Sequence, residues 1–187
     1  MTEFWLIRHG QTDWNLTGRW QGQALNAPGL NDMGYAQALA ALKHLIGKHF
    51  AAIYSSDLLR ACQTAELFAE TLGLTVILEP RLREINLGAW EGMLGADIET
   101  LYPYEFAERA RDPFHAHAPQ GESPFVVAER VVAAVKDIAD EHPNDSVLIV
   151  SHGVSLAVII CHAEGIAMDK IYEHIPENAK PYHVEWK

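Results

Sequence analysis

Two histidines occur in the same local context at widely separated positions of the chain. Each follows a short apolar run and precedes a glycine, in the motifs Arg8-His9-Gly10 and Ser151-His152-Gly153. A neutral imidazole can attack phosphorus and hold it covalently, which divides one difficult displacement into two easier ones. Glycine lets the backbone turn sharply and lets a ligand approach closely. The two motifs therefore predict one shared site.

Arginine and glutamate side chains supply the other groups that this chemistry requires. Arg8 adjoins the first histidine, and Arg60 ends the motif Ser55-Ser56-Asp57-Leu58-Leu59-Arg60. A planar guanidinium matches phosphate oxygens in bidentate fashion and can stabilise the transition state. Glu84 can protonate a leaving oxygen and then deprotonate the incoming water. Glu91 lies in the same glycine-flanked segment, so the sequence leaves it open as an alternative acid.

Strand ends can bring these distant residues together. Short apolar runs predict buried strands, and amphipathic runs between them predict helices. In an open α/β sheet, ligands bind beyond the carboxyl ends of the strands. The alternation predicts a three-layer α/β/α sandwich with a mainly parallel sheet. We expect strands at residues 3–7, 51–54, 74–78 and 147–150, an edge strand at 182–186, and helices at 32–47, 57–73, 124–141 and 155–161.

The borders between these elements carry further signals. Asp32 and Asp57 each precede a helical pattern, so we expect both to be N-caps. Periodicity weakens between residues 88 and 123, which predicts one or two short helices and an irregular excursion that serves as a lid or side wall. Because the chain has no repeat or linker, we expect a single domain over residues 1–187, with the lid-like excursion at about 92–123.

Composition excludes several classes of partner. The formal net charge is −11, which repels nucleic acid and anionic membranes, so an anionic substrate needs a local group of arginines. No window holds the roughly 20 apolar residues of a membrane helix, and the amino terminus lacks an export pattern. Cys62 and Cys161 have no metal-binding or redox spacing. We expect a cytoplasmic protein whose partner is neither nucleic acid nor a membrane, and a homodimer is left open.

Four stretches resemble the motifs of the histidine phosphatase superfamily, the phosphoglycerate-mutase-like group. They follow the family's order along nearly the whole chain, and each stands at a predicted strand end. An isolated Arg-His-Gly is frequent by chance, whereas four ordered motifs are highly specific. The stretches are Leu6-Ile7-Arg8-His9-Gly10-Gln11-Thr12, the segment from Ser55 to Ala65, Leu82-Arg83-Glu84-Ile85-Asn86-Leu87-Gly88-Ala89-Trp90-Glu91-Gly92, and Val150-Ser151-His152-Gly153.

The resemblance implies a role for each matching residue. His9 would be the phosphorylated nucleophile, and Glu84 would be the proton donor. Arg8, Arg60 and His152 would form the phosphate pocket, with the imidazole of His152 positively charged. No metal and no organic cofactor is implied. Further contacts to phosphate or substrate would come from Asn15, Gln21, Gly22 and Gly153.

Within the family, the sequence favours the phosphatases over the mutases. Mutases are longer and carry extra basic residues in an insertion, whereas residues 92–120 offer only Arg109 and Arg111 as strong cations. The motif Gln120-Gly121-Glu122-Ser123 also resembles the phosphatase branch, in which α-ribazole phosphatases and broad-specificity phosphatases are similar. A cofactor-dependent mutase-type phosphotransferase is the alternative. A wall for an organic, partly apolar alcohol is expected from Trp14, Trp20, Trp90, Tyr102, Tyr104 and Phe106.

Two other classes of function compete with a histidine phosphatase. A catalytically inactive relative would bind phosphorylated ligands without turnover, although the candidate site residues are intact. A metal-dependent hydrolase would use pairs such as His115 and His117, which can lie on one side of an extended segment. No cysteine or clear carboxylate partner accompanies that pair. For the remaining histidines we expect surface or core positions.

Overall fold

A five-stranded sheet forms the centre of the protein. The computed structural model describes residues 1–187 and places the strands in the order β3-β2-β4-β1-β5. The first four strands of that order are parallel, and β5 lies antiparallel to β1 at the edge. The mainly parallel sheet and the edge strand at the tail confirm the predictions. The strands are β1 (Thr2–Arg8), β2 (Ala52–Ser55), β3 (Val76–Leu78), β4 (Ser146–Ser151) and β5 (Tyr182–Trp186).

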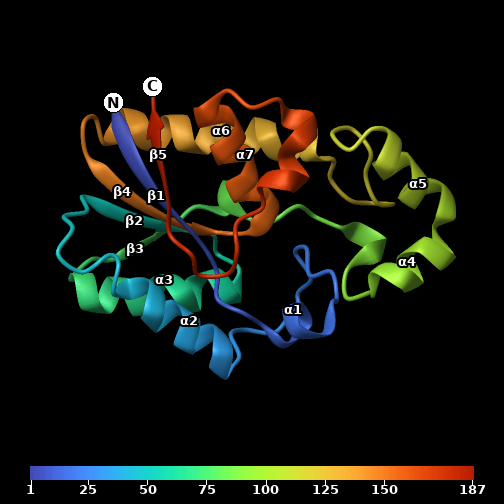
Figure 1. The fold of residues 1–187 in the computed structure, drawn as a ribbon, viewed down its shortest axis with the longest axis horizontal. Coiled ribbons are helices and arrows are strands. Elements are labelled where there is room, and N and C mark those ends of the chain that lie inside the picture. The colour runs from blue at the N-terminus through green and yellow to red at the C-terminus, as the bar shows by residue number, and fades with distance from the viewer.

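Helices cover both faces of the sheet, which confirms the three-layer α/β fold. One face carries α2 (Asp32–Leu42) and α3 (Leu59–Leu72), and the other carries α6 (Pro124–Glu141) and α7 (Gly153–Glu164) (Figure 1). Successive side chains of a strand point to opposite faces. Leu6 of β1 accordingly packs in the core with α6 and α7, whereas its neighbour Ile7 packs in the core with α2 and α3.

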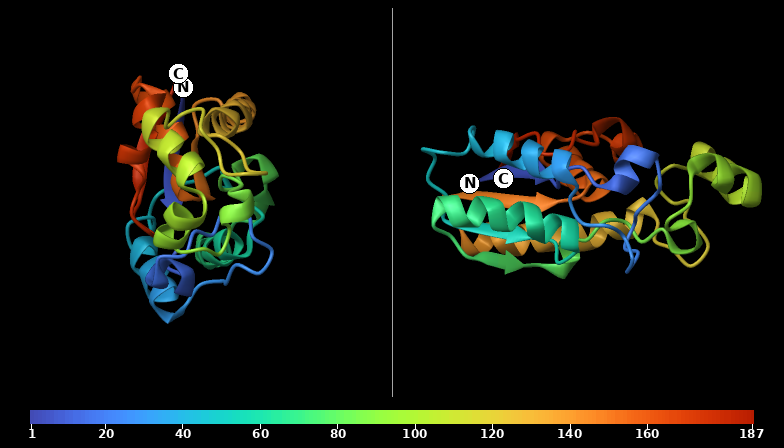
Figure 2. Two further views of the ribbon diagram at one scale, coloured as in Figure 1. Left: turned by 90° about the vertical axis from the view of Figure 1, so that its right-hand side faces the viewer. Right: turned by 90° about the horizontal axis from the view of Figure 1, so that it is seen from below.

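Short elements lie beyond the carboxyl ends of the parallel strands. Figure 2 shows α4 and α5 projecting past the end of the sheet. They have a small core of their own, formed by Trp90, Ile98 and Ala118. We call residues 88–120 the α4–α5 wall. The short elements of the chain are α1 (Asp13–Thr17), η1 (Pro80–Leu82), η2 (Gly88–Trp90), α4 (Gly95–Leu101), α5 (Pro103–Arg111) and η3 (Met168–His174).

Both predicted N-caps are wrong. Asn31 caps α2, because its side-chain oxygen accepts a hydrogen bond from the N–H of Gly34, and Asp32 is the first helical residue. The N-cap of α3 is Leu58, whose side chain makes no capping bond. Asp57 instead accepts a hydrogen bond from Arg83 at 2.6 Å. The Asp57 carboxylate therefore forms a long-range ion pair with Arg83 in place of the capping bond that the local pattern predicted.

Several element borders also differ from the predicted ones. α2 ends at Leu42 and continues as turns toward residue 47, and β3 begins at Val76. α7 begins at Gly153, directly after the strand, and runs to Glu164. The early start matters because it points the first N–H groups of a helix at the strand ends. No helix of the structure has the length and the apolar character that crossing a membrane requires.

Candidate active site

Three neighbouring strands end at the same edge of the sheet. β1 and β2 both pair in parallel with β4, in register up to their last residues. The residues that follow these strands therefore meet, although they are far apart in the sequence. The ring centroids of His9 and His152 lie 5.2 Å apart. The structure thus brings the two His-Gly motifs together.

Two hydrogen bonds define the tautomer of His9. Its Nδ1 lies 2.8 Å from the carbonyl oxygen of Gly10, which can only accept, so Nδ1 carries the hydrogen. Nε of Arg60, which can only donate, lies 3.1 Å from Nε2, so Nε2 carries a lone pair. Burial lowers the pKa of His9 well below its ordinary value, and the charges of Arg60 and Arg8 lower it further. The ring is a neutral imidazole with a nucleophilic Nε2.

Residues that the sequence did not single out hold the backbone of His9. The side-chain amide of Asn178 donates to the His9 carbonyl oxygen at 2.7 Å, and the N–H of Gly10 donates to Thr64 at 3.1 Å. Thr64 lies one turn after Arg60 on α3, a spacing that could have indicated its role. A Cβ at Gly10 would lie 2.4 Å from the carbonyl oxygen of Gly34. This glycine therefore serves packing rather than ligand approach.

His152 is completely buried behind the cavity. Its Nε2 lies 2.8 Å from the hydroxyl of Ser56, while its Nδ1 has no hydrogen-bond partner. Burial lowers the pKa of His152 well below its ordinary value, and Arg60, His9 and Arg8 add to this shift. The ring is neutral in this environment. The predicted positive charge on His152 therefore requires an anion, such as a phosphoryl group, next to it.

The two predicted arginines stand beside His9 without a carboxylate bonded to either. Arg60 is 3% exposed and donates from one terminal nitrogen to the carbonyl oxygen of Gly22 at 2.9 Å. Burial lowers its pKa to about 10, so the guanidinium stays charged at neutral pH. Arg8 donates to the carbonyl oxygen of Pro176 at 3.0 Å, and burial lowers its pKa as well. Both charges are available to an anion.

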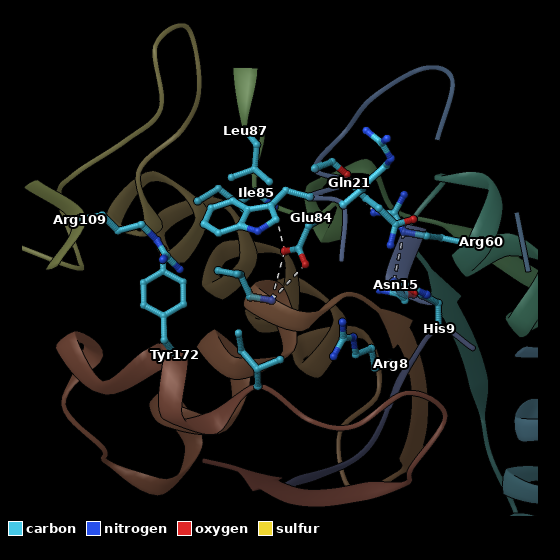
Figure 3. Close-up of a pocket in the computed structure, with 15 residues that line it drawn as sticks. Arg8, His9, Asn15, Gln21, Arg60, Glu84, Ile85, Leu87, Arg109 and Tyr172 are labelled. Carbon is cyan, nitrogen blue, oxygen red and sulfur yellow. Dashed lines mark hydrogen bonds between the residues drawn. The ribbon is translucent and has the colours of Figure 1, made fainter. Parts of the chain in front are cut away.

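Glu84 and Glu91 have clearly different surroundings. Glu84 lines the cavity, and its carboxylate accepts from the N–H of Ile85 at 2.9 Å and from the N–H of Val154 at 3.2 Å, in the first turn of α7 (Figure 3). Glu91 does not line the cavity. Its carboxylate accepts from the N–H groups of Gln23 at 2.7 Å and Leu87 at 3.2 Å, which fixes two loops to each other. Of the two, only Glu84 is placed to reach a bound substrate.

A partly buried ion pair holds the segment that carries Glu84. Arg130 of α6 donates to the carbonyl oxygens of Arg81 and Arg83 at 2.7 Å each and to that of Glu84 at 2.9 Å. It also pairs with Glu122 at 2.9 Å. Glu122 in turn accepts from the N–H of Asn86 at 2.8 Å. The Gly-Glu-Ser motif that resembled the phosphatase branch therefore positions the backbone around Glu84.

These groups surround a cavity of about 260 Å³. His152 lies outside its lining, next to His9. A Cβ at Gly153 would lie 3.7 Å from the guanidinium carbon of Arg8 and 3.5 Å from Glu84, so this glycine leaves space at the site itself. The cavity is lined by seven of the nine predicted site residues, namely Arg8, His9, Asn15, Gln21, Gly22, Arg60 and Glu84.

The predicted aromatic wall is wrong for five of its six members. Only Trp20 lines the cavity. Trp90 is 1% exposed because it forms the core of the α4–α5 wall, and Tyr102 and Phe106 pack against it. Tyr104 is 70% exposed. Sequence reasoning did not single out three other lining residues as parts of the site: Arg19, Arg109 and Tyr172.

The histidines proposed for a metal-dependent hydrolase do not form a metal-binding group. His115 Nδ1 lies 3.0 Å from Asp112, and His117 Nδ1 lies 2.9 Å from the carbonyl oxygen of Ala118. No set of three or more histidine, cysteine, aspartate or glutamate side chains in the chain is arranged to hold a metal ion.

Comparison with known proteins identifies the family. Residues 4–187 match the histidine phosphatase superfamily (branch 1), and the chain belongs to it. It is similar to phosphoserine phosphatase 1 of Hydrogenobacter thermophilus, with 35% identity over 96% of this chain and 84% of that protein. It is 36% identical to GpmB of Proteus mirabilis, described as a probable phosphoglycerate mutase, over 89% of this chain and 76% of that protein.

A solved structure supports the same assignment. A mycobacterial glucosyl-3-phosphoglycerate phosphatase superposes with a TM-score of 0.87 and 32% identity, covering 97% of this chain and 91% of that one. Membership of the superfamily, together with the similarity to two phosphatases, makes this chain a phosphomonoester hydrolase. The fold, the family and the enzyme class predicted from the sequence are confirmed.

Proposed function

We propose that the chain hydrolyses small phosphomonoesters through a phosphohistidine formed on Nε2 of His9. The observation that carries this proposal is the tautomer of His9. Nδ1 donates to the carbonyl oxygen of Gly10, which leaves the Nε2 lone pair directed at Arg60. A neutral imidazole fixed in this way, next to two buried guanidiniums, is suited to attack a phosphoryl group.

The first step transfers the phosphoryl group to the enzyme. Arg60 exchanges its hydrogen bond to Nε2 for one to a phosphoryl oxygen, and Arg8 binds a second oxygen. Nε2 of His9 forms the N–P bond as the P–O bond to the alcohol breaks. Glu84, in its acid form, gives its proton to the leaving oxygen, so the products are the alcohol, phosphohistidine and the Glu84 carboxylate.

The second step releases inorganic phosphate. The Glu84 carboxylate takes a proton from water, the water oxygen attacks phosphorus, and the N–P bond breaks, which restores neutral His9. His152 would gain a positive charge beside the phosphoryl dianion and stabilise it. Contacts to phosphate or substrate are assigned to Asn15, Gln21, Gly22 and Gly153. The amide nitrogen of Asn15 is suited to this role because its oxygen already accepts from the N–H of Thr12.

The covalent step can be tested directly. Acid-quenched enzyme given labelled substrate should retain acid-labile phosphate, and His9→Ala should retain none and lose p-nitrophenyl phosphate turnover. His44→Ala, which changes an exposed histidine, is the matched control and should behave like the wild type. Turnover without an adduct would contradict the proposal. Activity lost in excess EDTA would favour a metal-dependent hydrolase, and no turnover of any ester would indicate a non-catalytic relative.

Hydrolysis is favoured over the mutase alternative by the charge of the α4–α5 wall. Of its two arginines, only Arg109 lines the cavity, whereas Arg111 forms an exposed ion pair with Glu108 at 2.5 Å. A mutase must hold a second phosphate and exclude water. We expect phosphate release from 3-phosphoglycerate, without 2-phosphoglycerate formation, when 2,3-bisphosphoglycerate is present. Faster isomerisation than phosphate release would assign the chain to the mutases.

The α4–α5 wall is assigned as a side wall of the cavity within a single domain, since it carries Arg109 to the cavity mouth.

The state of the cysteines indicates the cellular compartment. Cys62 and Cys161 are both free thiols. Free thiols suit a reducing compartment, so we assign the chain to the cytoplasm.

A further inference from the structure

The cavity contains more positive charge than phosphoryl transfer uses. Four arginines line it, against Glu84 as the one lining carboxylate, in a chain whose formal net charge is −11. Arg8 and Arg60 stand next to His9 and are used by the phosphoryl group. Arg19 and Arg109 have no part in the reaction steps. Because like charges gathered at a cavity raise its free energy, this surplus indicates a second anionic group on the ligand.

Arg109 is held by aromatic rings and not by a carboxylate. Its guanidinium carbon lies 4.1 Å from the ring centroid of Tyr172 and 4.9 Å from that of Trp20. All three side chains line the cavity. Ring contacts hold the guanidinium through its faces and leave the N–H donors at its edge unused. We call these three residues the Arg109 clamp.

The Arg109 clamp lies on the leaving-group side of the cavity. Figure 3 shows Arg109 and Tyr172 across the cavity from His9 and Arg60, with Glu84 between the two groups. In the proposed reaction the ester oxygen lies between phosphorus and Glu84. An ester whose phosphorus is at His9 therefore directs its alcohol portion past Glu84, toward Arg109.

We infer that the Arg109 clamp binds a carboxylate on the leaving alcohol, so that the substrates are phosphate esters of small hydroxy or amino acids. This inference rests on the proposed function. A carboxylate presents two coplanar oxygens that match one planar guanidinium. A second phosphate, with its greater charge, would need more cations, and Arg19 already donates to the carbonyl oxygen of Gly92 at 2.7 Å. Arg109 covers one face of Trp20 and one face of Tyr172, which argues against the apolar alcohol expected from the sequence.

This inference can be tested with two substrates that differ only in the presence of the carboxylate. O-phosphoserine and O-phosphoethanolamine share the phosphate ester and the amine. A charged hydrogen bond contributes about 1.5–3 kcal/mol, so the wild type should prefer phosphoserine about 10- to 100-fold in kcat/KM. In Arg109→Met this ratio should fall to within about threefold of one. A packing role alone would lower both rates and leave the ratio intact.

Arg111→Met is the matched control, because Arg111 lies on the same helix but pairs with Glu108 and does not line the cavity. It should keep the wild-type ratio. If Arg109→Met does not fold, Arg109→Lys decides, since lysine keeps the charge and loses the planar fork. A fall in the ratio of at least about threefold in that variant supports the inference, and an unchanged ratio overturns it.

Three other results would overturn the inference. The wild type could show no preference for phosphoserine, or Arg109→Met could retain the preference. An Arg109-dependent preference for fructose 1,6-bisphosphate over fructose 6-phosphate would assign the clamp to a second phosphate. These outcomes are distinct from failure of the proposed function, which would show as no phosphohistidine and no release of phosphate from p-nitrophenyl phosphate.

Discussion

The two ends of the cavity are built in different ways. At the end proposed to bind phosphate, which we call the phosphate end, His9, Arg60 and His152 are each 3% exposed or less, and every one of them is hydrogen-bonded to backbone or to a neighbouring side chain. At the mouth, Arg109 and Tyr172 are only half-buried, and they contact each other through ring and guanidinium faces.

This difference indicates that the two ends have different tasks, the reaction at the buried end and the choice of substrate at the mouth. Burial strengthens the interaction between fixed charges and a developing negative charge, so the reacting groups belong on the strand ends of the main core. Arg109 at the mouth is carried by α5, which packs on the small core of the α4–α5 wall, so it can change without disturbing the sheet, whereas Tyr172 of η3 packs against the main core. Variants at the phosphate end should therefore affect the reaction rate, and variants at the mouth should affect substrate choice.

The largest contrast is expected between two neighbouring carboxylates. Glu84→Gln keeps the hydrogen-bond acceptor but removes the proton, so kcat should fall about 10²- to 10⁴-fold. Glu91→Gln keeps its acceptor for two backbone N–H groups and should change kcat by less than about threefold. Steady-state assays with phosphoserine would show the difference. Equal losses in both variants would mean that the acid has been misassigned.

A smaller contrast is expected between arginines at the two ends. Arg60→Met removes a donor to the transition state, which typically costs about 10²- to 10³-fold in rate. Arg19→Met should cost less than about tenfold, because Arg19 is exposed and donates to the carbonyl oxygen of Gly92. The comparison requires p-nitrophenyl phosphate, which has no carboxylate, and melting curves to verify folding. Similar losses would remove the distinction between the two ends.

Loosening the α4–α5 wall should affect substrate binding more than the covalent step. Ile98→Ala leaves a void in the wall's small core, where such truncations cost about 2–5 kcal/mol. We expect KM for phosphoserine to rise several-fold, with an unchanged yield of phosphohistidine at saturating substrate. Glu99→Ala changes an exposed neighbour and serves as control. A lower adduct yield in Ile98→Ala would couple the wall to the chemistry.

The smallest effect concerns stability at mildly acidic pH. His9 and His152 are neutral in the fold with lowered pKa values, whereas unfolded histidine takes up a proton near pH 6.5. The unfolded state then binds more protons, so stability is complete above about pH 6.5 and decreases below it, by about 1.4 kcal/mol per pH unit for each histidine.

Urea unfolding at pH 7.0 and 5.5 would measure this decrease. The double variant His9→Asn, His152→Asn should flatten the pH dependence. Asp57 and Glu79 do not interfere, because their lowered pKa values place their contribution at more acidic pH. An unchanged slope in the double variant would show that other groups titrate in this range.

Local patterns in the sequence were sufficient for most of the framework. The helix predicted at residues 124–141 has those bounds in the structure, and the strands at 3–7 and 147–150 lie within β1 and β4. The helix shows as an apolar residue pattern with helical spacing, and the buried strands show as continuous apolar runs. Both patterns can be read directly from the order of residues. The four motifs likewise identified the family, because each motif is contiguous.

The motifs indicated seven of the residues that line the cavity, whereas only the tertiary structure decided which other side chains face it. Residue type and flanking glycines do not distinguish Glu84 from Glu91, and only the position within the motif favoured Glu84. The surroundings of the two carboxylates depend on α7 and on a distant loop. Asp57 has the sequence context of an N-cap and yet pairs with Arg83. Arg109 enters the site because α5 packs beside Trp20 and η3. Contacts between side chains that are far apart in the sequence depend on how whole helices and strands pack. The local order of residues does not specify that packing.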